Sequence, residues 1–156
     1  MASKNLITQS GYDKFKKELV DLKENSIPEV TQKIKDARAQ GDLSENAEYD
    51  AARDEQARIN ARITEIEHIL KHAEVFDIEK ADTSVVYFGS TVTFEDVESG
   101  NEMVYRIVGS YEVDIMSGDI SYESPIGEKL LGKKVGDVVT VNAPNGDIDY
   151  RILDFQ

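Results

Sequence analysis

The sequence predicts an α+β protein: an N-terminal antiparallel two-helix coiled coil followed by a small antiparallel sheet domain with one short helix. Apolar residues recur at steps of three and four over residues 12–73, as in amphipathic helices. Beyond residue 76 they form short β-branched runs bounded by turn residues. The charge balance also changes, from 12 basic and 15 acidic residues in 1–76 to 6 and 16 in 77–156. We therefore expect two domains, 1–76 and 77–156.

The first helix is predicted to begin at Ser10, whose side chain can cap it while an acidic residue lies three positions on. Its apolar stripe contains one irregular step, of five residues, between Leu22 and Ile27. Pro28 follows directly, and proline removes a helix hydrogen bond and displaces the axis. The pattern fits either a kink here or a separate helix capped by Ser26.

The second helix is predicted to start after the acidic residues of the segment 40–53, with Ala52 as the first of its apolar positions, and supplies the facing stripe of an antiparallel hairpin. The two stripes pair with nearly constant residue-number sums of 88 to 90, as a hairpin requires. The pairs are Phe15–Ala73, Leu19–Leu70, Leu22–Ile66, Ile27–Ile63, Val30–Ile59 and Ala37–Ala52. This register places residues 44 and 45 at the tip of a projection about 45 Å long, at ~1.5 Å per residue over roughly thirty residues.

The second half is predicted to contain strands in the runs 84–97, 101–109, 118–124 and 136–155. Turn residues at 98–101 and 144–147 separate strands, and the second group is a strong hairpin signal. The segment "SPIGEKLLGK" predicts the short helix.

Composition excludes several classes of function. The net charge of −13 argues against general binding to duplex nucleic acid, which needs a basic surface. The absence of cysteine excludes disulfides and thiolate sites, and no apolar run has signal-peptide or membrane length, so we expect a cytoplasmic protein. His68 and His72 have a zinc-compatible spacing but no third ligand nearby, so we expect solvated side chains. Without a catalytic triad order, phosphate-binding glycine loop or Cys/His cluster, a self-sufficient enzyme is not expected.

Two carboxylates at the predicted tip could share a cation. Asp42 and Glu45 lie three residues apart, and Mg²⁺ is commonly held by one or two protein carboxylates together with waters and phosphate oxygens. Such a pair would be half a site, completed by a partner that already holds a metal and a phosphodiester. The alternative is that Asp42, Ser44 and Asn46 only cap a helix. Spacing alone favours the capping interpretation.

Basic residues flank the predicted tip. The register brings Arg38 and Arg53 near it, with Lys35 and Arg58 behind them. Such a patch could hold a nucleic-acid backbone while the acids address a metal. Surface ion pairs within a helix, such as Arg58 with Asp54, explain the same residues equally well.

Four segments together resemble one family. They are "EVTQKIKDARAQGDLSENAEYDAARDEQ", "VVYFGSTVTFEDV", "YRIVGSYEVDIMSGDISYESPIGEKLLGKKVGD" and "DYRILDF". Over nearly the whole chain they resemble the bacterial Gre transcript-cleavage factors, GreA type. The resemblance implies an N-terminal antiparallel coiled coil and a C-terminal domain similar to FK506-binding proteins.

The resemblance also implies a function. In this family the C-terminal domain docks on RNA polymerase at the rim of its secondary channel, and the coiled coil enters the channel. Two tip acids, matching Asp42 and Glu45, help to hold the second catalytic Mg²⁺ and its water. The polymerase's own active site then cuts backtracked RNA near its 3′ end. The protein alone is expected to bind no cofactor.

Further residue roles follow from the same resemblance. Arg38 and Arg53 match the family's RNA-contacting basic patch, and Ser124, Pro125 and Ile126 match its polymerase-docking surface. The resemblance adds DNA binding to the expected attributes, against the acidic balance of the chain. We expect a monomer with no membrane association.

The sequence departs from the family pattern at Asp50, where a histidine is frequent in relatives, and we expect this side chain to face water. Two other functions remain open. A factor of the same shape could bind the channel and inhibit polymerase without promoting cleavage, although the presence of both Asp42 and Glu45 argues against it. The expected fold of residues 77–156 also allows a peptidyl-prolyl isomerase or chaperone, because fold does not determine activity.

Overall fold

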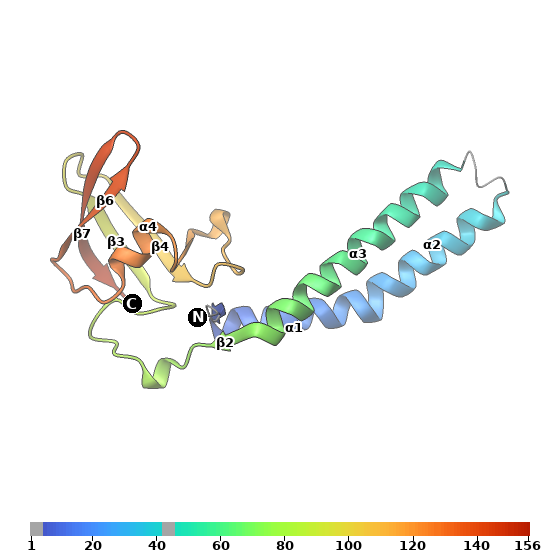
Figure 1. Ribbon diagram of the computed structural model, residues 1–156, viewed down its shortest axis with the longest axis horizontal. Helices are drawn as coiled ribbons and strands as arrows, with labels where there is room; N and C mark the ends of the chain where they lie inside the picture. Colours follow the sequence, from blue (N-terminus) through green and yellow to red (C-terminus); the bar gives the residue numbers. More distant parts are fainter. Residues whose placement is uncertain (1–4, 42–45) are drawn as a thin grey trace. The chain divides into compact units, whose positions relative to one another are not determined.

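The computed structural model describes residues 5–41 and 46–156 (Figure 1). The chain divides into a helical unit, Tyr12–His72, and a sheet unit made of Ala73–Gln156 and the described part of Met1–Gly11. The predicted α+β fold class, a helical hairpin plus a small sheet domain with one short helix, is confirmed. None of the helices in the described ranges is long and apolar enough to cross a membrane.

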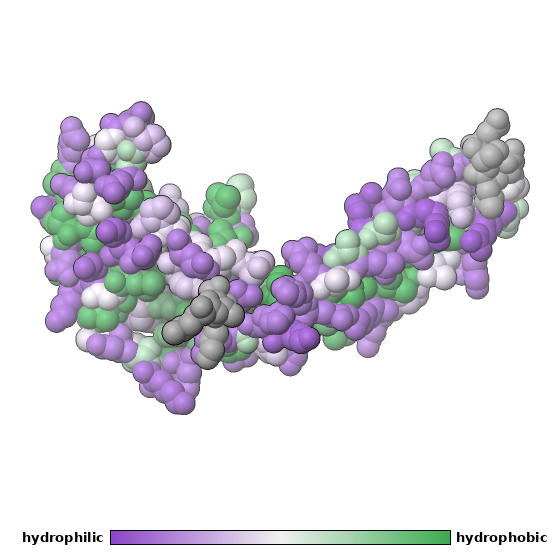
Figure 2. Space-filling model, viewed as in Figure 1, coloured by the Kyte–Doolittle hydropathy of each residue, from purple (hydrophilic) through white to green (hydrophobic). Residues whose placement is uncertain are grey.

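The helical unit is a hairpin in which α2 (Ile27–Ala39) packs along α3 (Ala47–His72). Ion pairs such as Lys33–Glu55 at 3.1 Å and Lys23–Glu67 at 3.2 Å connect the two arms in the antiparallel sense. Hydrophilic side chains cover most of the hairpin surface visible in Figure 2. The buried seam consists of Phe15, Val30, Ile34, Ala37, Ala52, Ile66 and Ile69. Ile69 is buried and Leu70 only partly, which differs by one residue from the predicted stripe.

The irregular step between Leu22 and Ile27 has a third explanation that sequence reasoning did not include. Helix α1 (Gln9–Asp21) continues through one π-helical turn, η1 (Leu22–Ser26), into α2. The Ile27 N–H donates to the Leu22 carbonyl, so one turn accommodates five residues. Ser26 keeps helical backbone angles and makes no side-chain cap, and Pro28 occupies the first turn of α2. The wide turn keeps the apolar stripe on one side and lies directly before Pro28, which lacks an N–H.

The cap of the first helix was predicted two residues too late. Helix α1 begins at Gln9, and the Thr8 hydroxyl, not Ser10, accepts the hydrogen bond from the Gly11 N–H at 3.0 Å. The Ser10 hydroxyl instead lies 3.2 Å from the Thr8 hydroxyl and accepts from Arg106 at 3.3 Å. Threonine is a good cap, and here its hydroxyl is also held by the carboxylate of Glu112.

The sheet unit contains a five-stranded sheet in the order β5-β4-β3-β7-β6 (Figure 1). Its strands are β3 (Thr91–Asp96), β4 (Glu102–Val108), β5 (Asp119–Ser121), β6 (Val138–Ala143) and β7 (Gly146–Phe155). Neighbours are antiparallel except β4 and β5, which are parallel, so the sheet is mixed and not purely antiparallel as predicted. The segment from Gly109 to Gly118, which includes the 3₁₀ turn η3 (Ile115–Ser117), forms the crossover that joins this parallel pair.

One helix and one edge pair complete this unit. Helix α4 (Pro125–Leu130) packs its Leu130 into a core with Phe94, Ile107, Tyr150 and Ile152. Strands β1 (Asn5–Ile7) and β2 (Ala73–Val75) form a separate two-stranded parallel sheet, followed by the 3₁₀ turn η2 (Ile78–Lys80). Residues 5–11 therefore belong with the sheet, a placement that sequence reasoning did not anticipate.

The predicted turns and strands of this half are largely correct. Ala143 pairs with Gly146, so Pro144 and Asn145 form the two-residue hairpin loop, and Gly146 adopts a φ of +122°. The first predicted run is wrong over residues 84–90, where the chain makes turns before β3 begins at Thr91.

Candidate functional site

The predicted metal-binding pair, Asp42 and Glu45, lies outside the described residues. Helix α2 ends at Ala39, and the N–H groups of Gln40 and Gly41 donate to carbonyls of the last helical turn. Gly41 has a φ of +117°, a conformation typical of the residue that ends a helix.

Asn46 joins the two helix ends that flank this segment. Its side-chain oxygen accepts a hydrogen bond from the Tyr49 N–H at 3.1 Å and thereby caps α3. Its side-chain nitrogen donates to the Ala37 carbonyl at 2.7 Å, in the last turn of α2. One amide thus satisfies an orphan donor of α3 and gives the Ala37 carbonyl, which also accepts from the Gln40 N–H at 3.2 Å, a second hydrogen bond. The capping interpretation of the sequence is therefore correct for Asn46.

We expect Asn46→Ala to destabilise the hairpin by about 1–2 kcal/mol, because a lost N-cap alone costs about 1 kcal/mol and the Ala37 contact is lost with it. Asn46→Asp is the matched control, since it keeps the capping oxygen and replaces the donor to Ala37 by a second, charged oxygen. Urea unfolding, monitored through the helix signal, measures the stability of both variants. Equal stability of Asn46→Ala and the unchanged protein would contradict this role.

The predicted basic residues lie on one side of the hairpin end. The Arg38 guanidinium is 5.8 Å from the centre of the Tyr49 ring, within cation–π range. The Arg53 Nη1 donates to Gln56 Oε1 at 3.2 Å. Both arginines are exposed, and neither forms an ion pair with a described carboxylate. The predicted alternative, an ion pair between Arg58 and Asp54, is not formed.

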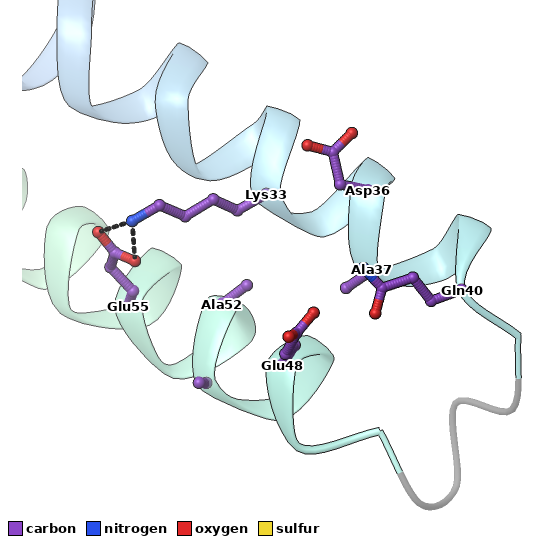
Figure 3. A pocket seen from close by; sticks show the side chains of 8 residues that line it. Lys33, Asp36, Ala37, Gln40, Glu48, Ala52 and Glu55 are labelled. Atoms are coloured by element: carbon purple, nitrogen blue, oxygen red, sulfur yellow. Dashed lines mark hydrogen bonds and ion pairs between the residues drawn. The ribbon is translucent and has the colours of Figure 1, made fainter.

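The other side of the hairpin end is a groove of about 440 Å³ with acidic walls (Figure 3). Its lining is Lys33, Asp36, Ala37, Gln40, Glu48, Ala51, Ala52 and Glu55. Lys33 crosses the groove to Glu55, with N–O distances of 3.1 and 3.3 Å. Successive helix residues are about 100° apart, so these positions face away from Arg38 and Arg53. The alanines leave the groove open because their side chains are short.

Acidic groups in the described ranges do not form a metal site by themselves. No three histidine or acidic side chains there come close enough together to bind an ion. His68 and His72 are exposed, with ring centroids 4.5 Å apart, as expected for solvated residues.

The predicted docking residues form the start of α4. The Ser124 hydroxyl accepts from the Gly127 N–H at 3.1 Å and donates to the Ser121 carbonyl at 2.6 Å, so it caps this helix. Pro125 is the exposed first residue of the helix, and Ile126 packs partly against the core. Of the three side chains, only Pro125 is largely free for a partner.

Comparison with known proteins identifies the family. Residues 5–75 match a family described as "Transcription elongation factor, N-terminal", and residues 81–156 match "Transcription elongation factor, GreA/GreB, C-term". The chain belongs to the GreA/GreB family of transcription elongation factors.

Individual relatives match this chain over almost its full length. The chain is 48% identical to transcription elongation factor GreA of Lachnoclostridium phytofermentans, covering 98% of this chain and 96% of the relative. It is 43% identical to GreA of Chloroherpeton thalassium, with 100% and 99% covered. The solved GreA factor homolog 1 of Thermus thermophilus is 29% identical, covers 99% of each chain and superposes with a TM-score of 0.46. The expected DNA binding has no support in these family descriptions.

Proposed function

We propose that this GreA/GreB family member enters the secondary channel of bacterial RNA polymerase and stimulates the polymerase's own cleavage of backtracked RNA. It would act as an accessory factor, not as an enzyme on its own. The observation that supports this most is family membership over the whole chain together with two carboxylates, Asp42 and Glu45, between the ends of a helical hairpin.

Asp42 and Glu45 would hold the second catalytic Mg²⁺ of the polymerase. Carboxylate oxygens are the ligands Mg²⁺ prefers, and one or two protein carboxylates are its usual share. When bound, this ion supplies stabilisation of the attacking and leaving oxygens of the phosphodiester. The chain supplies the ligands and the positioning of their flanking helices, which Asn46 links directly.

The side of the hairpin with Arg38, Tyr49 and Arg53 would face the RNA. Two guanidinium groups without a described carboxylate partner are available for phosphate oxygens, which arginine binds in a bidentate manner. The acidic groove on the opposite side would repel the RNA backbone. The charge difference between the two sides thus favours one orientation of the hairpin on the transcript.

Docking would use the exposed part of the sheet unit around Ser124, Pro125 and Ile126. Apolar side chains also lie open on the nearby crossover before β5, where Ile115 is 83% and Met116 95% exposed. Such exposure on an acidic domain favours a protein partner over RNA.

A cleavage assay on an arrested elongation complex tests the proposal. Added protein should shorten the RNA from its 3′ end and release a short fragment, and synthesis should then resume. A protein that binds the complex and slows synthesis without shortening the RNA would be a channel inhibitor, and the proposal would be wrong.

A further inference from the structure

A small aromatic pocket lies in the sheet unit, and its lining includes no residue of the hairpin end or of α4. It has a volume of about 220 Å³ and is formed by three short segments and one strand residue. Its lining is Thr8, Gln9, Ser10, Phe76, Ile78, Tyr87, Phe88, Gly89 and Arg106. A cavity of roughly 150 Å³ lined by apolar side chains accepts benzene, so this pocket has room for one ring with a small substituent.

The aromatic walls are held in place by their neighbours. The rings of Phe76 and Phe88 lie 5.2 Å apart at 55°, and Phe88 meets Tyr122 edge-on at 5.3 Å. Such tilted and edge-to-face contacts are the favoured geometries of aromatic pairs. Gly89, with a φ of +90°, contributes only backbone to the lining. The pocket therefore exists before any ligand arrives.

Arg106 gives this apolar pocket one positive charge. It comes from β4, and its Nη2 donates to the Ser10 hydroxyl at 3.3 Å. No described carboxylate forms an ion pair with it, although acids outnumber bases 16 to 6 in residues 77–156. By contrast, Arg151 in the same unit is paired with Glu95 at 3.0 Å.

Glu112 is linked to Arg106 through the Ser10 and Thr8 hydroxyls, and its carboxylate already accepts other hydrogen bonds. Glu112 accepts from the Thr8 N–H at 2.8 Å, the Gly109 N–H at 2.9 Å and the Thr8 hydroxyl. Its charge is therefore matched by three donors. The guanidinium of Arg106 has five N–H groups in a planar fork, a geometry suited to a carboxylate.

We propose that this pocket binds an aromatic group bearing a carboxylate, with the ring against Phe76 and Phe88 and the carboxylate on Arg106. A free aromatic acid and the C-terminal phenylalanine of another protein share this chemistry. The inference is independent of the cleavage function, because no residue of the pocket belongs to the hairpin tip.

Titration of the full-length protein by amide NMR tests the proposal. Three probes are used: benzoate, neutral benzamide, and a short peptide ending in phenylalanine with a free carboxylate. Benzoate should shift the amides of Phe88, Gly89 and Ser10, and benzamide should bind at least about tenfold more weakly, since a charge-assisted pair contributes about 1.5–3 kcal/mol. Tighter binding of the peptide than of benzoate would identify a protein terminus as the ligand, and weaker binding a free acid.

Arg106→Gln should weaken benzoate binding by at least about tenfold and leave benzamide binding unchanged. Arg151→Gln is the matched control, because it removes the same charge from the same unit outside the pocket and should change neither. If Arg106→Gln fails to fold, the comparison of benzoate with benzamide in the unchanged protein still decides. Equal binding of both probes, or no shift at the pocket amides, would overturn the proposal.

Discussion

Replacing Asp42 and Glu45 by Asn and Gln together should reduce stimulated transcript cleavage at least about 100-fold, because even outer-shell changes at metal sites cost about 10–100-fold. Each substitution replaces a charged oxygen by a neutral amide of the same shape, which is a much weaker ligand for Mg²⁺. Binding to polymerase should survive, since the proposed docking residues lie in the sheet unit. Cleavage of the arrested transcript and binding competition with the unchanged protein measure the two effects separately.

Glu48→Gln is the matched control for this prediction. Glu48 is an exposed acid in the first turn of α3, three residues beyond Glu45, and lines the groove on the opposite side from the arginines. It removes one negative charge near the same end of the hairpin but no proposed ligand. Cleavage by the Asp42/Glu45 double variant at the level of Glu48→Gln would show that the two acids are not metal ligands.

Glu112→Ala should destabilise the sheet unit by at least about 3 kcal/mol, because each buried donor left without an acceptor costs about 1–3 kcal/mol. The substitution removes the acceptor of the Thr8 and Gly109 N–H groups and of the Thr8 hydroxyl. Thr8 is only 7% exposed, so water cannot readily replace the carboxylate. Denaturant unfolding and the amide exchange rate of Thr8 measure the effect.

Two further variants serve as controls for the stability loss of Glu112→Ala. Glu112→Gln keeps one acceptor oxygen and should lose clearly less stability than Glu112→Ala. Glu102→Ala removes an exposed acid from β4 and should change stability by less than about 0.5 kcal/mol, as surface substitutions usually do. A loss below about 1 kcal/mol for Glu112→Ala would mean that water satisfies the three donors.

The strongest periodic signals in the sequence predicted the fold correctly. Steps of three and four identified the hairpin, and β-branched runs with a Pro144–Asn145 turn identified the sheet. The three-residue strands β1 and β2 were missed, because three residues are too few to show a period. The parallel pairing of β5 was missed as well, since alternation of side chains does not encode strand direction.

The functional residues were predictable to different degrees. The positions of Arg38, Arg53 and Asn46 near the hairpin end could be predicted from the helix register. Their side-chain partners, such as Tyr49 for Arg38 and the Ala37 carbonyl for Asn46, could not. The proposed metal role of Asp42 and Glu45 rests on the family resemblance, because the spacing of two acids in the sequence fits a helix cap as well. The Arg106 pocket was not predictable, because its walls come from segments up to about a hundred residues apart in the chain.

The Mg²⁺ concentration that gives half-maximal stimulated cleavage tests the central claim most directly. If Asp42 and Glu45 hold the ion, Asp42→Asn should raise this concentration at least about tenfold. Arg53→Gln, a change in the proposed RNA-contacting side, should lower the cleavage rate and leave the Mg²⁺ concentration unchanged. The same half-maximal concentration for Asp42→Asn and the unchanged protein would contradict the account, since the acids would then act without binding the metal.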